Sequence, residues 1–177
     1  MLIANKLRFI RLFKSSLGIR PPPSFLVDAA GRQGPYEPHA NRQCMMAELV
    51  GLFAALLLVA NALFQLALAA GVPWGNAAYG GKVAQEDGSL PTRYRIMSLV
   101  SAMFMGILIL VILSASGIVT SSPLSTGATV WACRGASMLF ALNTAGNLTS
   151  TSKVERWVMG TVTTCLTIAF ALIGWVL

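Results

Sequence analysis

The chain has 177 residues, of which 55% are hydrophobic and only 11% are charged, and its formal net charge is +7. Roughly 25% of the residues in an ordinary soluble domain are charged, so this composition argues against such a domain and favours a protein embedded in lipid. The basic residues flank apolar stretches or lie near the N-terminus. Anionic lipid is therefore a better expected partner than nucleic acid.

The first 45 residues form a basic extension with two parts. In residues 2–17 apolar side chains recur at helical spacing and acidic residues are absent, which predicts an amphipathic helix on the surface of an anionic leaflet. An organellar transit peptide has the same character and stays an alternative. Residues 20–40 are rich in proline, glycine and polar side chains, which predicts an extended arm. The candidate contacts with lipid or a partner are Lys6, Arg8, Arg11, Lys14 and Arg20.

Four uncharged stretches follow, each long enough to cross a bilayer: residues 49–81, 96–133, 135–152 and 157–177. Lipid offers no hydrogen bonds to the backbone, so an apolar stretch of about 20 residues becomes a helix. We therefore expect an all-α, polytopic membrane domain over residues 46–177, with four transmembrane helices in an antiparallel bundle. The expected spans are residues 46–70, 92–117, 126–146 and 153–176.

Capping and turn residues set the expected limits of these helices. Gly71 stops the first helix, and Pro91 precedes the second. The fourth opens with Ser152 and Glu155, a capping-box pattern in which each side chain satisfies a free backbone N–H group. The short link at residues 147–151 predicts that the third and fourth helices pack side by side and antiparallel.

Aromatic side chains lie near the expected helix ends, as in the aromatic belts of membrane proteins. Four spans would place one group at one side of the membrane, namely Trp74, Tyr79, Tyr94 and Trp157. Trp131 and Trp175 would lie at the other side. Counting all lysines and arginines favours cytoplasmic termini, whereas counting only those close to the spans weakens or reverses that preference.

Polar side chains inside the expected spans are costly and often mark a pathway. They are Glu48, Asn61, Gln65, Arg134 and Asn143. One interpretation is a polar path through a small transporter or channel. The other is that the amides form hydrogen bonds between helices and that Arg134 extends to the interface. Glu48 is expected within reach of Arg134 if the first and third spans begin on the same side.

The loop after the first span, residues 71–81, combines glycines with Trp74 and Tyr79. Glycine permits turns that other residues resist, and these aromatic residues supply rigid amphipathic surface. The loop is either a binding loop or cap over the bundle, or a connection anchored at the headgroups.

No group of residues indicates a reaction. The histidine at position 39 lies outside the spans, and the three cysteines are not at metal-ligand or redox spacing. Phosphate-binding glycine loops, nucleophile elbows and paired carboxylates are absent from the sequence. We therefore expect no enzyme, with no catalytic residues, no metal site and no cofactor.

A set of motifs resembles a family of small four-helix membrane proteins from bacteria. They are Pro73-Trp74-Gly75, Gly80-Gly81, Leu90-Pro91 and Arg95, then Asn143, Asn147, Ser150, Ser152, Glu155 and Arg156. The resemblance covers residues 48–177 and implies the fold, but it carries no activity. The basic, proline-rich extension is not a feature of that family and suggests an added docking role.

From these features we expect a non-catalytic accessory subunit of an integral membrane complex. Its partners would be the lipids of an anionic leaflet and other integral membrane subunits, with no nucleic acid. The expected location is the bacterial cytoplasmic membrane, with the mitochondrial inner membrane as the alternative. A small oligomeric transporter or channel, with Asn61, Gln65, Arg134 and Asn143 along its path, is the second functional hypothesis.

Overall fold

The computed structural model describes residues 38–120 and 124–176. The predicted amphipathic helix and most of the predicted arm, with Lys6, Arg8, Arg11, Lys14 and Arg20, lie outside the described residues. Within these two ranges every regular element is a helix. The long elements are α2 (Pro38–Ala70), α3 (Thr92–Ala115) and α4 (Thr126–Leu148), followed by a composite rod made of η4 (Glu155–Met159), α5 (Gly160–Ala171) and η5 (Leu172–Val176).

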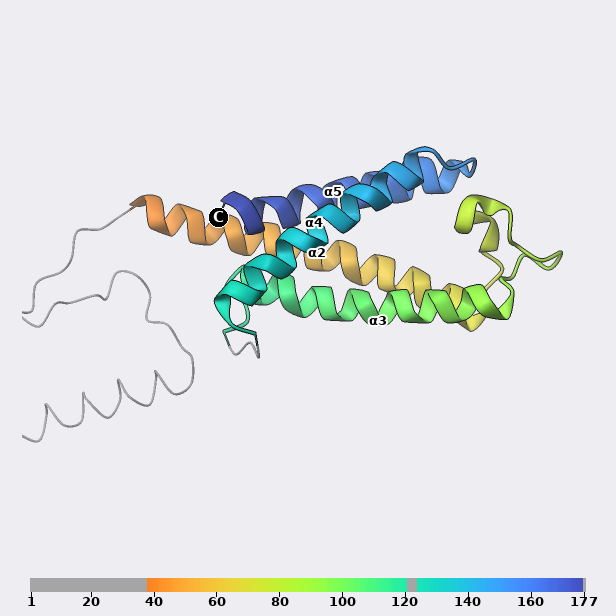
Figure 1. The fold of residues 1–177 in the computed structure, drawn as a ribbon, viewed down its shortest axis with the longest axis horizontal. Helices are drawn as coiled ribbons and strands as arrows, with labels where there is room; N and C mark the ends of the chain where they lie inside the picture. The colour runs from red at the N-terminus through yellow and green to blue at the C-terminus, as the bar shows by residue number, and fades with distance from the viewer. Residues whose placement is uncertain (1–37, 121–123, 177) are drawn as a thin grey trace, which may run out of the picture.

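Two antiparallel hairpins build the bundle. The most extensive contacts lie between α2 and α3 and between α4 and α5. The hairpins cross near the end that holds the α3–α4 turn and diverge toward the opposite end, where residues 71–91 lie (Figure 1). The expected side-by-side packing of the last two helices is thereby confirmed.

Three helices are long and apolar enough to cross a membrane: Asn41–Ala70, Thr92–Ala115 and Glu155–Val176. Only 28%, 33% and 39% of their most apolar stretches are buried within the chain. The remaining surface carries large apolar side chains such as Leu56, Met103 and Ile107. Soluble monomers rarely expose apolar patches of this extent, so lipid is the solvent for these faces and the chain is an integral membrane protein.

The third predicted span, α4, is 23 residues long but is not among these three helices. Arg134, Asn143 and Asn147 lower its mean hydropathy. Every polar group at membrane depth needs a partner, so α4 depends on protein contacts more than its neighbours do.

The structure shifts one boundary and confirms another. The first long helix begins at Pro38 rather than at residue 46, so residues 38–45 belong to α2 and not to an arm. Proline suits the first turn of a helix because no N–H is needed there, and nothing up to Gly51 interrupts the helix.

At the other end of α2, Gly71 has φ 92° and stops the helix as predicted. Its N–H bonds to the Leu68 carbonyl at 3.1 Å, and the Val72 N–H bonds to the Ala67 carbonyl at 3.1 Å, which is the Schellman pattern. The Arg95 Nε atom donates to the Ala69 carbonyl at 2.9 Å and so places a cation at this helix C-terminus.

The core lies along the inner faces of α2, α3, α4 and the composite rod. Its largest fully buried side chains include Leu58, Ile112, Leu166 and Phe170. The rings of Phe140 and Phe170 stack with centroids 5.6 Å apart and join α4 to α5. A second cluster of Leu68, Ala78 and Leu90 fixes the loop of residues 71–91 to α2.

The α2 helix approaches the end of α3 closely at Gly51. A Cβ atom at this position would overlap both the Cβ and Oγ atoms of Ser116. Glycine therefore sets the distance between these helices, which is the packing role of small residues in membrane helices.

Candidate functional site

The loop between α2 and α3 is a folded element. It contains two short 3-10 turns, η2 (Gly75–Ala77) and η3 (Tyr79–Gly81). Tyr79, Gly80 and Gly81 have φ values of 53°, 77° and 70°. Such a conformation is strained for a bulky residue and requires outside support. Tyr79 receives it from hydrogen bonds between its hydroxyl and the Ser98 Oγ atom, 3.0 Å away, and the Tyr94 carbonyl, 3.4 Å away.

Glu155 ties this loop to the α4–α5 turn. Its buried carboxylate accepts the Gly80 N–H on both oxygens, at 2.9 and 3.0 Å, and also the Ser150 hydroxyl. The Thr151 hydroxyl donates to the Gly80 carbonyl at 3.0 Å, and the Ser152 hydroxyl donates to the Asn76 carbonyl at 3.1 Å. We call this set the loop latch: Asn76, Gly80, Ser150, Thr151, Ser152 and Glu155.

The loop latch corrects the predicted capping box. The Ser152 N–H donates to the Ser150 Oγ atom at 3.1 Å, so Glu155 does not serve it. The Gly80 N–H would have no other acceptor among the described residues, whereas the Ser152 N–H has the Ser150 hydroxyl nearby. The Glu155 carboxylate therefore stabilises the fold more by accepting from Gly80 and Ser150 than by accepting from Ser152. The loop is thus a cap fastened to the second hairpin.

A tight turn extends from the same cap. The Ser89 N–H donates to the Asp87 Oδ1 atom at 2.9 Å, and this hydrogen bond lowers the pKa of the fully exposed Asp87 carboxyl. The Gly75 N–H donates to the Gly88 carbonyl at 2.9 Å and joins this turn to η2.

The predicted aromatic anchors separate into two groups as expected. At the capped end, the rings of Tyr79 and Tyr94 lie 4.9 Å apart, and Trp74 stacks on Phe64 with centroids 6.1 Å apart. Trp157 belongs to η4 beside the loop latch and is 71% exposed. Trp131 and Trp175 lie together at the opposite end.

Arg134 lies between these two tryptophans. Its guanidinium carbon is 5.0 Å from the centre of the Trp131 ring and 4.5 Å from that of Trp175, distances typical of cation–π contacts. Its Nε atom donates to the Gly174 carbonyl at 2.8 Å. The arginine therefore fastens the end of the last rod to α4 between the two tryptophans.

The structure does not join Glu48 to Arg134. Glu48 is exposed on α2, and its Oε1 atom contacts the Cys44 Sγ atom at 3.6 Å. The guanidinium is already held by the Gly174 carbonyl and the two indole rings, so no ion pair forms between these two residues.

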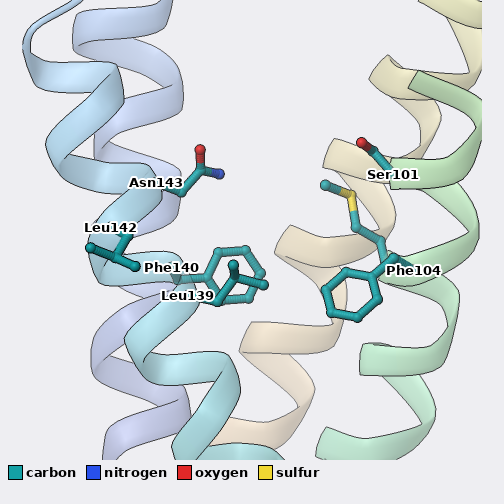
Figure 2. Close-up of a pocket in the computed structure, with 7 residues that line it drawn as sticks. Ser101, Phe104, Leu139, Phe140, Leu142 and Asn143 are labelled. Atoms are coloured by element: carbon teal, nitrogen blue, oxygen red, sulfur yellow. The ribbon is translucent and has the colours of Figure 1, made fainter. Parts of the chain in front are cut away.

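Two of the three amides, Asn61 and Gln65, place polar atoms inside the bundle. Asn61 is 8% exposed on the inner face of α2, and the buried Gln65 Oε1 atom has no hydrogen-bond partner among the described residues. Asn143 is exposed, and its amide points into the gap between α4 and α3 (Figure 2). Nine positions separate it from Arg134, about 13 Å along a helix, so the four residues of the proposed path do not meet at one place.

A polar contact between α4 and α5 was missed by the sequence reasoning. The Thr144 Oγ1 atom lies 2.9 Å from the buried Thr163 Oγ1 atom, and the Asn147 Nδ2 atom donates to the same hydroxyl at 3.3 Å. The short link at residues 147–151 already implied an antiparallel register that sets these residues opposite one another. This cluster is the interhelical hydrogen bonding expected of polar side chains in membrane bundles.

A cleft of about 410 Å³ opens between the hairpins, near the middle of α3 and in the second half of α4. Asn143 and Ser101 lie across it from one another, and Phe140 and Phe104 stand on opposite walls (Figure 2). The full lining is Ser101, Phe104, Met105, Leu139, Phe140, Leu142 and Asn143. An apolar cleft of this size with a few polar groups is the usual form of a ligand site.

Comparisons with family models, curated proteins and solved structures give no match.

Proposed function

We propose that the chain is a non-catalytic accessory subunit of a larger integral membrane assembly. Its bundle, with α4 as the fourth span, would pack on transmembrane helices of other subunits. The N-terminal arm and its basic residues would contact the same partners or an anionic leaflet. The bacterial cytoplasmic membrane is the proposed location, with the mitochondrial inner membrane as the alternative.

The observation that supports this proposal is the outward face of α4. Gly135 and Gly146 are exposed there, and a Cβ atom at either position would meet nothing within 4 Å. Eleven residues make about three turns, so both glycines lie on one side of the helix. Small residues allow the backbone of a second helix to approach closely. We call Gly135 and Gly146 the partner face.

The outward faces of α2 and α3 expose mainly large apolar side chains, for example Leu56 and Leu63 on α2 and Ile107 and Leu110 on α3. Such surfaces suit lipid tails. The α4 helix also exposes such side chains, among them Met138 and Leu142, but together with Gly135 and Gly146. The α4 helix, which is more polar and carries glycine on its surface, suits protein.

Leucine at both positions of the partner face is expected to reduce recovery of the native complex about tenfold, the equivalent of 1.4 kcal/mol of lost packing. The measurement is copurification from native membranes in mild detergent, followed by native mass spectrometry. Gly106→Leu on α3 is the matched control, because Gly106 is also exposed with open space around it. Recovery of homo-oligomers alone from native membranes would reject the accessory function.

The transporter or channel is the second candidate, and the unpartnered Gln65 Oε1 atom beside the buried Asn61 favours it. Polar atoms in a membrane core often mark a path. If solute passes there, the purified chain in liposomes should transport it, and Asn61→Leu should lower the flux at least about tenfold. Thr161→Val, an exposed polar position on the outer side of α5, is the control. Absence of flux for ions and small polar solutes would remove this candidate.

A further inference from the structure

The polar groups of the cleft between α3 and α4 define the chemistry of a ligand. Asn143 has no hydrogen-bond partner among the residues that the structure describes, so its amide offers both a donor and an acceptor. The Ser101 hydroxyl already donates to the Met97 carbonyl at 2.9 Å and presents only its oxygen as an acceptor. A group that both donates and accepts a hydrogen bond satisfies the two side chains together.

The ligand must also be neutral. The residues that line the cleft carry no charge, and they belong to the middle of α3 and the second half of α4. An ion would lose its hydration there without gaining a counter-charge. A hydroxyl group meets both conditions, whereas a phosphate, a carboxylate or an amine does not.

The shape of the cleft excludes a transmembrane helix as its occupant. The lining covers residues 101–105 and 139–143, and each segment is about one turn, roughly 6 Å, along its helix. A spanning helix needs a surface about 30 Å long. The mouth is bordered by Leu142, which is 74% exposed, and by Phe104, which is 43% exposed, so the cleft opens toward the bilayer. A ligand thus enters from lipid.

We propose that this cleft binds the hydroxyl end of a neutral membrane lipid. The hydroxyl donates to the Ser101 oxygen and accepts from the Asn143 amide, or donates to the Asn143 oxygen. The apolar body of the lipid lies between Phe104 and Phe140 and extends past Leu142 into the bilayer. This site is separate from the partner face and does not depend on the accessory function.

The test uses the purified full chain in phosphatidylcholine vesicles and two probes with the same photoreactive chain. One probe is a long-chain alcohol, and the other is its methyl ether, which cannot donate a hydrogen bond. We expect saturable labelling of residues 101–105 and 139–143 by the alcohol, mapped by mass spectrometry. The ether should label these peptides about tenfold less, the change that corresponds to a lost hydrogen bond of about 1.4 kcal/mol.

Two cleft variants and one control variant make the result decisive. Asn143→Leu should reduce labelling by the alcohol about tenfold, whereas Asn41→Leu, the same change at an exposed position in the first turns of α2, should not. Leu139→Trp keeps both polar groups and should block labelling by filling the cleft. Circular dichroism and monodispersity verify the fold of each variant.

Equal labelling by the ether would overturn the proposal, because it would show only an apolar gap. Labelling that neither Asn143→Leu nor Leu139→Trp reduces would also overturn it. So would labelling that maps outside residues 101–105 and 139–143. A partner subunit is not needed in the vesicles, so this outcome is independent of whether the accessory function holds.

Discussion

Replacing Glu155 with leucine is expected to release the loop of residues 71–91 from the α4–α5 turn and to destabilise the bundle by about 3 kcal/mol. The carboxylate accepts the Gly80 N–H on both oxygens and the Ser150 hydroxyl, and it is buried. Leucine would leave these donors without their acceptor. Gly80, the residue after Tyr79, would lose the two hydrogen bonds that tie it to the α4–α5 turn.

Two measurements check this expectation: backbone hydrogen exchange of residues 74–91 and thermal unfolding in detergent. Glu155→Gln should have an intermediate effect, because the amide keeps one acceptor oxygen. Glu86→Leu makes the same change at an exposed carboxylate of the same loop and should alter neither quantity. If exchange in the loop is the same with and without the Glu155 carboxylate, the loop latch does not hold the cap.

Gly51→Ala is expected to be the most damaging change of a single methyl group in the described chain, with a cost of about 3 kcal/mol. The added Cβ atom would overlap the Cβ and Oγ atoms of Ser116. The Ser116 Cβ atom is fixed by the backbone, so rotation of the side chain cannot relieve the overlap and α2 and α3 must move apart. The buried side chains beside this crossing, among them Ile112, would then lose contacts.

A double-mutant cycle tests the cause. Ser116→Gly removes the two overlapping atoms, so it should restore most of the stability of Gly51→Ala, as measured by unfolding in detergent. Gly106→Ala is the control, because a Cβ atom there meets nothing within 4 Å and alanine favours the helix by about 1 kcal/mol. Equal losses of stability for Gly51→Ala and Gly106→Ala would show that the close contact between Gly51 and Ser116 does not limit the stability of the bundle.

The helices and most of their ends could be predicted because local signals control them. Gly71 supplies the left-handed conformation at the end of α2, and the Ser125 side chain accepts the Ala128 N–H at 3.3 Å at the start of α4. The early start of α2 at Pro38 was missed because proline-rich sequence predicts an arm as readily as a helix N-terminus. The π-helical turns η4 and η5 have no comparable local signal.

The role of Glu155 could not be read from its neighbours. Ser152 and Glu155 have the spacing of a capping box, and only the folded position of Gly80 shows that a distant N–H competes for the carboxylate. The cleft could not be predicted from local sequence either, because it depends on how far the two hairpins diverge. Asn143 was named from its sequence position, but nothing local to Ser101 indicates that it lies across from that amide.

The loop latch also constrains the order in which the chain assembles. The Gly80 N–H and the Glu155 carboxylate are 75 positions apart, and N-terminal segments leave the ribosome first. The α2–α3 hairpin is therefore inserted into the bilayer before its loop is bonded to Glu155. These hydrogen bonds form only after the last rod has been synthesised. Closure of the loop is a late step of biogenesis, and it occurs only in molecules whose final helix has been inserted beside the first hairpin.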